Sequence, residues 1–385
     1  MRIAYVTETW PPELNGVSLT VARTVKHLRD RGHQVDLIRP RQPGERAGAD
    51  HAQWLTSGWP IPMYRDLRFG FATARTLRRR YAQQRVELVH LATPGPLAWE
   101  ALRAARSLGL PATSDFRTNF HQYSGYYHLG GLEALVLWAL RRFHNRSALT
   151  FVPTRSVERE LAGQGFEHLA LVGRGVDTER FRPGRRSAEL RARWGANDDT
   201  PVLLTVCRIA AEKNIELALS SFHALRQVRP DARMVVVGDG PLRKRLTALH
   251  PAVRFVGVRS GEPLAACYAS ADLFVFPSLS ETFGNVTLEA LASGLPVVAY
   301  DTAAAGEHVR PGASGLLVRP GDARGFEAAV CTLGQQSERL AAMRPAAAKA
   351  ACKARWDDVL GRFERHLQDT IDASETPSPA AAVVA

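Results

Sequence analysis

Two glutamates, Glu281 and Glu289, frame the segment "ETFGNVTLE", which lies shortly before the apolar run "LPVVAY". Gly294 precedes that run in the position of a helix-ending glycine, so the spacing predicts a short helix over "NVTLEALAS" followed by a buried strand. Glu281 then lies just before the helix and Glu289 lies inside it. Acids near a helix N-terminus interact favourably with its dipole, by ~0.3–1 kcal/mol each, and this segment alone leaves that interpretation open beside a binding role.

The start of the predicted helix also offers chemistry. The backbone N–H groups of Phe283, Gly284 and Asn285 have no partner in a helix that begins there, so they form a candidate cradle for an anion. The two flanking carboxylates would accept hydrogen bonds from hydroxyl groups around that anion. A phosphate joined to a sugar has both features.

A second pair of charged residues, Arg208 and Lys213, lies in "CRIAAEKNIELAL", where a predicted strand passes into a predicted helix. Two cations at the carboxyl edge of a sheet suit a pyrophosphate, whose negative charge grows as its bond to a sugar breaks. The alternative is a pair of surface cations near a helix start. Because the glutamate segment occurs in the same chain, we favour a site for a diphosphate joined to a sugar.

Short apolar runs alternate with amphipathic stretches along the chain, beginning with "RIAYVT" and a helical pattern over residues 18–31. The alternation restarts after "GRGVDTERFRPGRRS", with later strands predicted at "PVLLTVCRI", "ARMVVVGDG", "VRFVGV" and "ADLFVFPS". This order predicts an α/β protein of two Rossmann-like, doubly wound domains with parallel sheets. Ligand is expected in the cleft between them, which faces the carboxyl ends of their strands.

The length also favours two domains, since 385 residues exceed the ~250–300 residues at which single cores usually split. We expect an N-terminal domain over residues 1–173, a linker over 174–186, a C-terminal domain over 187–355, a helix over 356–370 that packs back on the domains, and a disordered tail over 371–385.

The formal net charge of +12 indicates an anionic partner. Nucleic acid, an anionic membrane surface and a phosphorylated substrate all qualify, but no nucleic-acid-binding motif is present, so nucleic acid is not an expected partner. No run reaches the ~18 apolar residues that a membrane span needs, and the N-terminus has no signal-peptide pattern. The four cysteines have no metal-ligand spacing and are too few for a disulfide scaffold. We therefore expect a cytoplasmic protein, soluble or peripheral at the inner face of the membrane.

Taken together, these motifs resemble the retaining nucleotide-sugar glycosyltransferases of family four, which have the two-domain GT-B fold. The resemblance covers roughly residues 1–369 and is carried by the Glu-x7-Glu signature "ETFGNVTLE", the Arg-x4-Lys pair in "RIAAEK", the loop "GDGP" and the segment "GVDTERF". It implies that Arg208 and Lys213 hold the donor diphosphate. It also implies that Glu281 meets the donor sugar and that Glu289 binds the ribose hydroxyls.

Three glycines complete the site that the resemblance implies. Gly16 lies in "ETWPPELNGVSLTVA", which matches the family's loop after the first strand, and would let the backbone approach the phosphates. An ordinary turn is the alternative for this glycine. Gly238 and Gly240 belong to "GDGP", the expected donor-side loop.

The segment "SDFRTNFHQYSGYY" departs from the family pattern. The family commonly has a His-Thr pair after an apolar strand, and the histidine position is Arg117 here. Either Arg117 takes that place as a fixed cation or His121 reaches the site from the following turn. We favour Arg117 in this role with His121 on the acceptor side, and a solvated arginine with a core histidine is the alternative. Cys207 also replaces the glycine that usually precedes the family's arginine.

The resemblance implies that the sugar keeps its anomeric configuration without a protein nucleophile, and that the departing diphosphate helps to deprotonate the acceptor. Glu281 is therefore assigned no nucleophilic role. No acidic cluster in the sequence indicates a metal site, so we expect metal-independent catalysis without a cofactor.

Donor and acceptor are inferred from the same resemblance. Family members with stretches similar to "TNFHQYS" and "ETFGNVTLEA" often use GDP-mannose or act on membrane lipids, so we expect GDP-mannose before UDP-glucose, and a lipid or glycolipid acceptor. The segment "YSGYYHLGGLEALVLWALRRFHNR" predicts either a buried helix or a lipid-facing groove. Arginines at 68, 75, 78, 79 and 80 stand among Phe69, Phe71 and Tyr81, as in segments that dock on anionic lipid.

Two other functions remain compatible with parts of the sequence. A nucleotide-sugar 2-epimerase can share this two-domain fold and would interconvert a donor without an acceptor. A non-catalytic basic binding protein would bind nucleic acid or lipid with an affinity that falls steeply with salt. The Glu-x7-Glu signature together with the Arg-x4-Lys pair favours sugar transfer.

Overall fold

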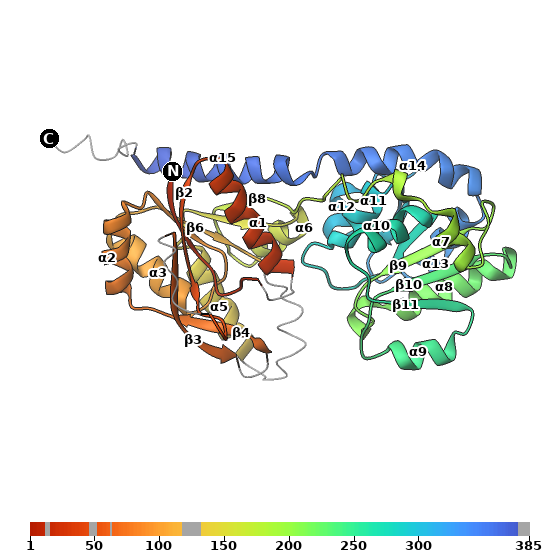
Figure 1. Ribbon diagram of the computed structural model, residues 1–385, viewed down its shortest axis with the longest axis horizontal. Coiled ribbons are helices and arrows are strands. Elements are labelled where there is room, and N and C mark those ends of the chain that lie inside the picture. Colours follow the sequence, from red (N-terminus) through yellow and green to blue (C-terminus); the bar gives the residue numbers. More distant parts are fainter. Residues whose placement is uncertain (12–15, 46–51, 62–63, 118–131, 376–385) are drawn as a thin grey trace. The chain divides into compact units, whose positions relative to one another are not determined.

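A computed structural model describes residues 1–11, 16–45, 52–61, 64–117 and 132–375. The chain divides into two compact units (Figure 1). Unit 1 comprises Met1–Val172 and Leu360–Ala385, and unit 2 comprises Gly173–Val359. Among the described residues, no helix has the length and apolar character that crossing a membrane requires.

Unit 1 contains an eight-stranded sheet with the order β4-β3-β2-β1-β5-β6-β7-β8. Neighbouring strands run parallel except for the β3–β4 pair, which is antiparallel. The strands are β1 (Arg2–Val6), β2 (Gln34–Pro40), β3 (Gln53–Ile61), β4 (Tyr64–Phe71), β5 (Leu88–Leu91), β6 (Ala112–Asp115), β7 (Leu149–Val152) and β8 (Leu169–Leu171).

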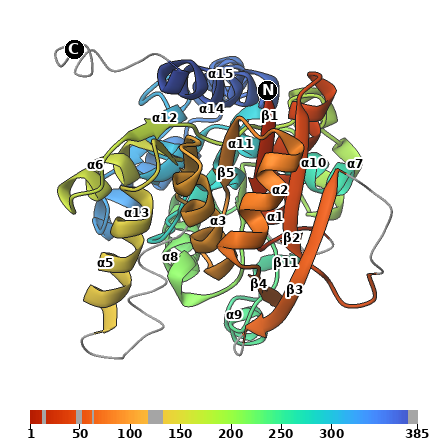
Figure 2. The same cartoon turned by 90° about the vertical axis from the view of Figure 1, so that its left-hand side faces the viewer.

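Helices cover both faces of this sheet (Figure 2). Successive residues of a strand point to opposite faces, and in β1 Ala4 and Val6 join one apolar cluster while Ile3 and Tyr5 join the other. The first cluster receives side chains from α2 and α3, and the second from α1 and α15. Among the described residues of unit 1, the helices are α1 (Gly16–Asp30), α2 (Ala74–Gln84), α3 (Pro96–Ser107), α5 (Leu132–His144) and α6 (Arg155–Gly163), together with most of α15 (Trp356–Glu375).

The sequence of helix α5 predicts either a buried helix or a lipid-facing groove, and the structure buries one side of the helix. Leu137 and Leu140 pack against an apolar cluster of unit 1, and Phe143 is fully buried. Leu135 and Trp138 instead remain 55% and 49% exposed. One side of the helix therefore belongs to the core and another presents apolar surface.

Unit 2 contains a six-stranded parallel sheet with the order β11-β10-β9-β12-β13-β14. Its strands are β9 (Val202–Val206), β10 (Arg233–Val237), β11 (Val253–Gly257), β12 (Leu273–Phe276), β13 (Val297–Tyr300) and β14 (Gly315–Val318). Side chains of α8 and α13 pack on one face of this sheet, and those of α10, α11 and α12 pack on the other.

The helices of unit 2 lie before, between and after these strands. They are α7 (Ala188–Arg193), α8 (Ile215–Val228), α9 (Arg243–Leu249), α10 (Gly261–Ser270), α11 (Asn285–Ala292), α12 (Ala303–His308), α13 (Ala323–Gly334) and α14 (Ser337–Cys352), with short 3₁₀ turns at Pro183–Arg185 and Ala211–Lys213. The predicted fold class, two doubly wound α/β domains, is thus what the structure contains.

The strand order of unit 2 indicates the position of a ligand site. The chain runs outward from β9 to β11 in one direction and then from β12 to β14 in the other, so the order reverses between β9 and β12. Open α/β sheets bind ligands at the carboxyl ends of the strands beside such a switch point. In unit 2 the loops that follow β9 and β12 meet this description.

Two expected boundaries differ from the structure. Residues of the expected linker, 174–186, pack within unit 2, where Val176 and Phe181 are buried in its core. The expected disordered tail from residue 371 is wrong for its first part, because α15 continues to Glu375. Leu367 and Ile371 lie one helical turn apart and are both buried in unit 1, so this contact prolongs the helix.

Candidate active site

The loops after β9 and β12 of unit 2 are joined by an ion pair between Lys213 and Glu281. Lys213 Nζ lies 2.5 Å from Glu281 Oε1 and donates to the Ser280 carbonyl at 3.2 Å. Ser278 Oγ donates to the same Glu281 oxygen at 2.9 Å. The side chains of Lys213 and Glu281 are only 17% and 16% exposed. Because an ammonium has three N–H donors, a further donor of Lys213 remains for a ligand.

Arg208, the other predicted cation, is more accessible than Lys213. Its side chain is 60% exposed, and its guanidinium lies 3.6 Å from Glu212 Oε1. Exposed ion pairs of this kind are worth only ~0–1 kcal/mol, so a phosphate that accepts two guanidinium bonds can replace the glutamate. Arg208 is therefore available to an anion at the carboxyl end of β9.

Gly238 and Gly240 support the loop that carries Arg208. A Cβ atom at Gly238 would lie 1.9 Å from the Cys207 carbonyl oxygen, and one at Gly240 would lie 2.4 Å from the Ile209 carbonyl oxygen. The φ of Gly238 is also +137°, where L-residues are rarely found. These glycines allow "GDGP" to pack against residues 207–209. Their observed contacts are thus with the Arg208 loop.

Cys207 occupies the position where the family commonly has glycine. Its backbone N–H donates to the Val237 carbonyl at 3.1 Å. Burial raises the pKa of its thiol to about 12, so the thiol is protonated and chemically inert near neutral pH. The substitution therefore places a small, partly buried side chain beside Arg208.

Helix α11 begins where the sequence predicts, directly after Gly284, whose φ of +86° is left-handed. In the described part of the chain, the backbone N–H groups of Phe283, Gly284 and Asn285 donate no hydrogen bond. The Phe283 carbonyl accepts from Ala304 N at 2.7 Å, and the Phe283 side chain is buried. The backbone at this helix start can therefore receive an anion, while the Phe283 ring belongs to the core.

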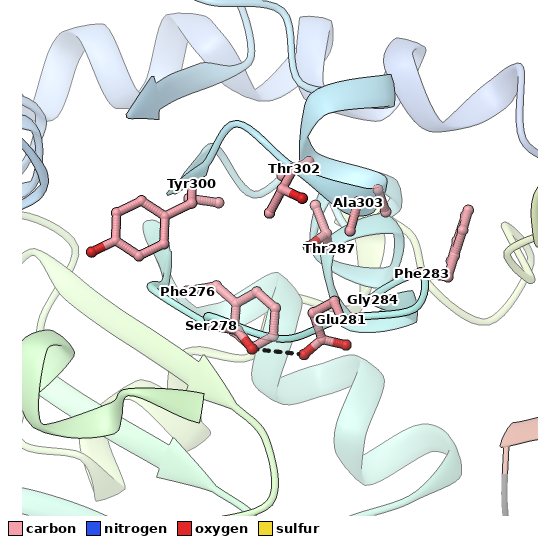
Figure 3. A pocket seen from close by; sticks show the side chains of 12 residues that line it. Phe276, Ser278, Glu281, Phe283, Gly284, Thr287, Tyr300, Thr302 and Ala303 are labelled. Carbon is pink, nitrogen blue, oxygen red and sulfur yellow. Dashed lines mark hydrogen bonds between the residues drawn. The ribbon is translucent and has the colours of Figure 1, made fainter. Parts of the chain in front are cut away.

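A pocket lies beside Glu281 and the start of α11 (Figure 3). It is open to solvent and is lined by residues from β12, the loop that follows it, α11, β13 and α12. Figure 3 shows Glu281 and Ser278 on one side of the pocket and Thr302 with Ala303 on another. Glu281, Ser278 and Thr302 give the pocket polar groups on two of its sides.

One wall of this pocket contains a strained residue that the sequence analysis missed. Ala303 has a φ of +49°, in the left-handed region, which is less favourable by roughly 1–2 kcal/mol for a residue with a side chain. Strain of this kind persists where surrounding contacts fix it and is frequent at binding sites. Alanine carries no sequence signal for a left-handed conformation, so the strain at Ala303 is evident only in the folded structure.

Glu289, the second acid of the signature, lies inside α11 and contacts Tyr268. Tyr268 Oη donates to Glu289 Oε2 at 2.9 Å. Burial raises the pKa of Glu289, and the Tyr268 hydrogen bond and the charge of Arg180 oppose that rise. The two glutamates therefore have different partners. Glu281 pairs with Lys213, and Glu289 accepts a hydrogen bond from Tyr268.

In unit 1, Arg117 lies just beyond the carboxyl end of β6 and is held by Asp115. Arg117 Nε donates to Asp115 Oδ2 at 2.6 Å, and His90 Nε2 lies 3.3 Å from the same oxygen. Burial alone would raise the pKa of Asp115, but the charges of Arg117 and His90 lower it. Arg117 is thus a fixed cation. Gly16 is the exposed first residue of α1, and His121 lies outside the described residues.

Unit 1 also contains a buried acid, Glu8, that the sequence analysis did not single out. Glu8 follows β1 and is only 8% exposed, with Oε1 accepting from Leu97 N and Gly70 N, both at 3.1 Å. A Cβ atom at Gly95 would lie 1.3 Å from Glu8 Oε2, so the carboxyl group fills the space that this glycine leaves. Burial raises the pKa of Glu8 to about 7.

Among the described residues, no group of three or more histidine, cysteine, aspartate or glutamate side chains is arranged to hold a metal ion. The charged groups gathered at the switch point of unit 2 are Arg208, Lys213 and Glu281, in the arrangement given above. They can bind a phosphate oxygen and hydroxyl groups side by side.

The raised pKa of Glu8 predicts a pH-dependent effect of Glu8→Gln. The pKa of Glu8 is about 7 in the folded state and ordinarily 4.5. The protonated Glu8 side chain therefore contributes its full stability below pH 4.5, and this contribution is lost as the pH rises through 7. Glutamine mimics the protonated acid. Relative to wild type, Glu8→Gln should gain about 3 kcal/mol of unfolding free energy between about pH 5 and about pH 8. Urea unfolding at both pH values measures the difference in unfolding free energy between the variant and wild type. An equal difference at the two pH values would contradict the raised pKa of Glu8.

Comparison with known proteins supports what the site indicates. Residues 14–180 match the family model for Glycosyltransferase Family 4, and residues 200–336 match that for Glycosyl transferases group 1. A GDP-mannose-dependent alpha-mannosyltransferase from Mycobacterium tuberculosis is 35% identical over 381 residues, which cover 94% of this chain and 96% of that protein. An alpha-monoglucosyldiacylglycerol synthase from Streptococcus pneumoniae is 28% identical over 78% of this chain and 71% of its own length.

Solved structures agree on the fold. A sucrose-phosphate synthase from Thermosynechococcus elongatus superposes with a TM-score of 0.75 at 19% identity, covering 97% of this chain and all of that one. The predicted resemblance is therefore confirmed at the level of the family and of the GT-B fold. The chain belongs to glycosyltransferase family 4 and is a hexosyltransferase that uses a nucleotide sugar.

Proposed function

We propose that this enzyme transfers mannose from GDP-mannose to a lipid-linked acceptor at the cytoplasmic face of the membrane, with retention of the anomeric configuration. The observation that carries the proposal is the identity of 35% over nearly the whole chain to a GDP-mannose-dependent alpha-mannosyltransferase. The similarity to a synthase that glucosylates diacylglycerol, according to its name, supports a lipid acceptor.

The cluster around Lys213 supports a role in leaving-group stabilisation. Transfer breaks the bond between the anomeric carbon and a phosphate oxygen, and the bonding electrons pass to the diphosphate. Arg208 and the remaining donor of Lys213 would bind the oxygens on which this charge develops. The unpartnered N–H groups at the start of α11 would add to this stabilisation.

Glu281 would position the sugar and would not attack it. Its Oε1 already accepts from Ser278 and is paired with Lys213, which leaves Oε2 for sugar hydroxyls. With no protein nucleophile assigned, the acceptor oxygen forms its bond to the anomeric carbon on the face that the diphosphate leaves. The proton of the acceptor hydroxyl passes to a diphosphate oxygen. The two cations supply positive charge without a metal ion, and metal independence stays a prediction.

The donor assignment predicts the outcome of a donor panel. Purified enzyme with membrane extract should move mannose from GDP-mannose into an organic-extractable product faster than it moves glucose from UDP-glucose, and donor consumption should require the extract. Assays of nucleotide release with each donor, with and without the extract, measure both points. The one-bond C1–H1 coupling in the NMR spectrum of the product measures its anomeric configuration, and an α-linked product is expected. Faster transfer from UDP-glucose would contradict the donor, whereas isomerised donor sugar without acceptor would indicate an epimerase.

The exposed arginines of α2 in unit 1 support the membrane location. Arg75, Arg78 and Arg79 are exposed on α2. In the preceding hairpin, Trp59 pairs with Phe69 and Ser57 with Phe71, so these side chains share one face, and Trp59 and Phe71 are 70% and 47% exposed. Trp54 and the Cβ position of Gly70 face α2 and α3, so these aromatic pairs lie on the opposite face of the sheet. The exposed arginines of α2 are the basic side chains that suit the interface of an anionic lipid bilayer.

Two residues expected on this surface are instead internal. Arg80 binds Asp36 through two contacts of 2.6 Å and lies over the Trp54 ring. Tyr81 is only 1% exposed and belongs to the core. Helical spacing explains the difference, because Leu77 and Tyr81 form the buried side of α2 while 75, 78 and 79 lie away from it. Arg80 is therefore unsuitable for testing lipid binding.

The docking surface predicts a selective effect of replacing Arg75, Arg78 and Arg79 by glutamine. Each basic residue near an anionic bilayer adds about 1 kcal/mol, so the triple variant should bind vesicles containing anionic lipid roughly 100-fold more weakly. Activity on a bilayer-embedded acceptor should fall with it, while activity on a short soluble acceptor should survive.

Replacing Lys244, Arg319 and Lys353 by glutamine provides a control with the same loss of charge from exposed positions of unit 2. Vesicle sedimentation and transfer assays on both acceptors measure the outcome. Equal losses of vesicle binding in the two triple variants would show that net charge alone attracts the lipid. That result would overturn the proposal that Arg75, Arg78 and Arg79 dock the enzyme on the membrane.

A further inference from the structure

The segment "GVDTERF" and helix α10 have no role in the chemistry described so far, yet Tyr268 of α10 contacts Glu289 and Phe181 of the segment packs on Tyr268. We propose that Tyr268 is a positioning residue for nucleotide binding, which holds the Glu289 carboxylate toward the ribose hydroxyls and is itself fixed by Phe181 of this segment. The inference rests on the proposed role of Glu289 in the donor site.

The contact between Tyr268 and Glu289 determines which carboxylate oxygen is left for a ligand. Tyr268 is fully buried, and its hydroxyl donates to Glu289 Oε2 at 2.9 Å. Within the described part of the chain, Glu289 Oε1 accepts no hydrogen bond. A buried tyrosine hydroxyl without a partner is unfavourable, so this bond restricts the rotamers of Glu289. One oxygen is thereby anchored in the protein and the other is available to a hydroxyl group.

The ring of Tyr268 is held by two aromatic neighbours. Its centroid lies 5.7 Å from that of Phe181 in an edge-to-face arrangement and 5.8 Å from that of Phe274 in β12. All three rings are buried in the same apolar cluster of unit 2. Because an aromatic ring packed on two sides has few alternative rotamers, the hydroxyl is presented to Glu289 in one direction.

The same segment also contributes charge to Glu289. Arg180 precedes Phe181, its side chain is 46% exposed, and its nearest ion-pair partner, Asp177, lies 3.9 Å away. The positive charge of Arg180 opposes the rise in the Glu289 pKa that burial causes. Residues 177–181 therefore act on the second signature glutamate in two ways, by packing through Phe181 and by charge through Arg180.

Tyr268→Phe separates positioning from general stability, because it removes a single hydroxyl and leaves the ring packing intact. Wild type should bind GDP at least about tenfold more tightly than 2′,3′-dideoxy-GDP, since the analogue lacks the hydroxyls that Glu289 accepts from. In Tyr268→Phe, affinity for GDP should fall about tenfold while affinity for the dideoxy analogue stays unchanged, so the preference disappears.

Titration calorimetry with both nucleotides measures these affinities, with UDP and its dideoxy analogue run alongside. Tyr81→Phe, at a buried tyrosine of unit 1, is the matched control and should keep the preference. Phe181→Leu, which keeps the Tyr268 hydroxyl but removes a ring contact, should give an intermediate preference and serves if Tyr268→Phe does not fold.

The outcomes distinguish a failure of the positioning role of Tyr268 from a failure of the proposed role of Glu289. If wild type shows no preference for the ribose hydroxyls, the proposed role of Glu289 fails. If wild type shows the preference and Tyr268→Phe keeps it, or weakens both nucleotides equally, Tyr268 has no positioning role and the inference is overturned.

Discussion

The ion pair between Lys213 and Glu281 is the interaction on which the proposed donor site depends. It joins the loops that follow β9 and β12, two strands that are neighbours in the sheet although the residues are 68 positions apart in sequence. Both side chains are more than four-fifths covered, and breaking such a pair leaves an unpaired charge that is strongly destabilising. The pair therefore fixes a cation and a hydrogen-bond acceptor side by side at the switch point.

The rest of unit 2 keeps these charged groups in place. Gly238 and Gly240 let one loop pack against the backbone beside Arg208, which no larger residue would allow. Ser278 holds Glu281, and Tyr268 holds Glu289, so each signature acid has a protein partner on one oxygen. A site arranged before ligand binding needs little rearrangement as charge develops on a leaving group, which is the condition for electrostatic catalysis.

Sequence reasoning could predict features that repeat locally and could not predict those that depend on distant contacts. The alternating apolar runs, Gly294 and the start of α11 carry local signals, and the fold and family predictions are confirmed. Glu8, Ala303 and the Arg80–Asp36 pair carry none, because burial, left-handed backbone and ion pairing between a helix and a distant strand arise only in the folded chain. The end of α15 was missed because Ile371 is buried against unit 1, in a stretch whose composition resembles a tail.

The central claim, that Lys213 at the switch point binds the donor diphosphate, is tested most directly by comparing GDP with GMP, and UDP with UMP, in calorimetric titrations. Wild type should prefer a diphosphate by at least roughly tenfold, because a charge-assisted hydrogen bond contributes ~1.5–3 kcal/mol. Lys213→Ala should lose most of that preference while nearly retaining affinity for the monophosphate, and Lys244→Ala, at an exposed position of the same unit, should behave as wild type. An undiminished preference for the diphosphate in Lys213→Ala would contradict the account.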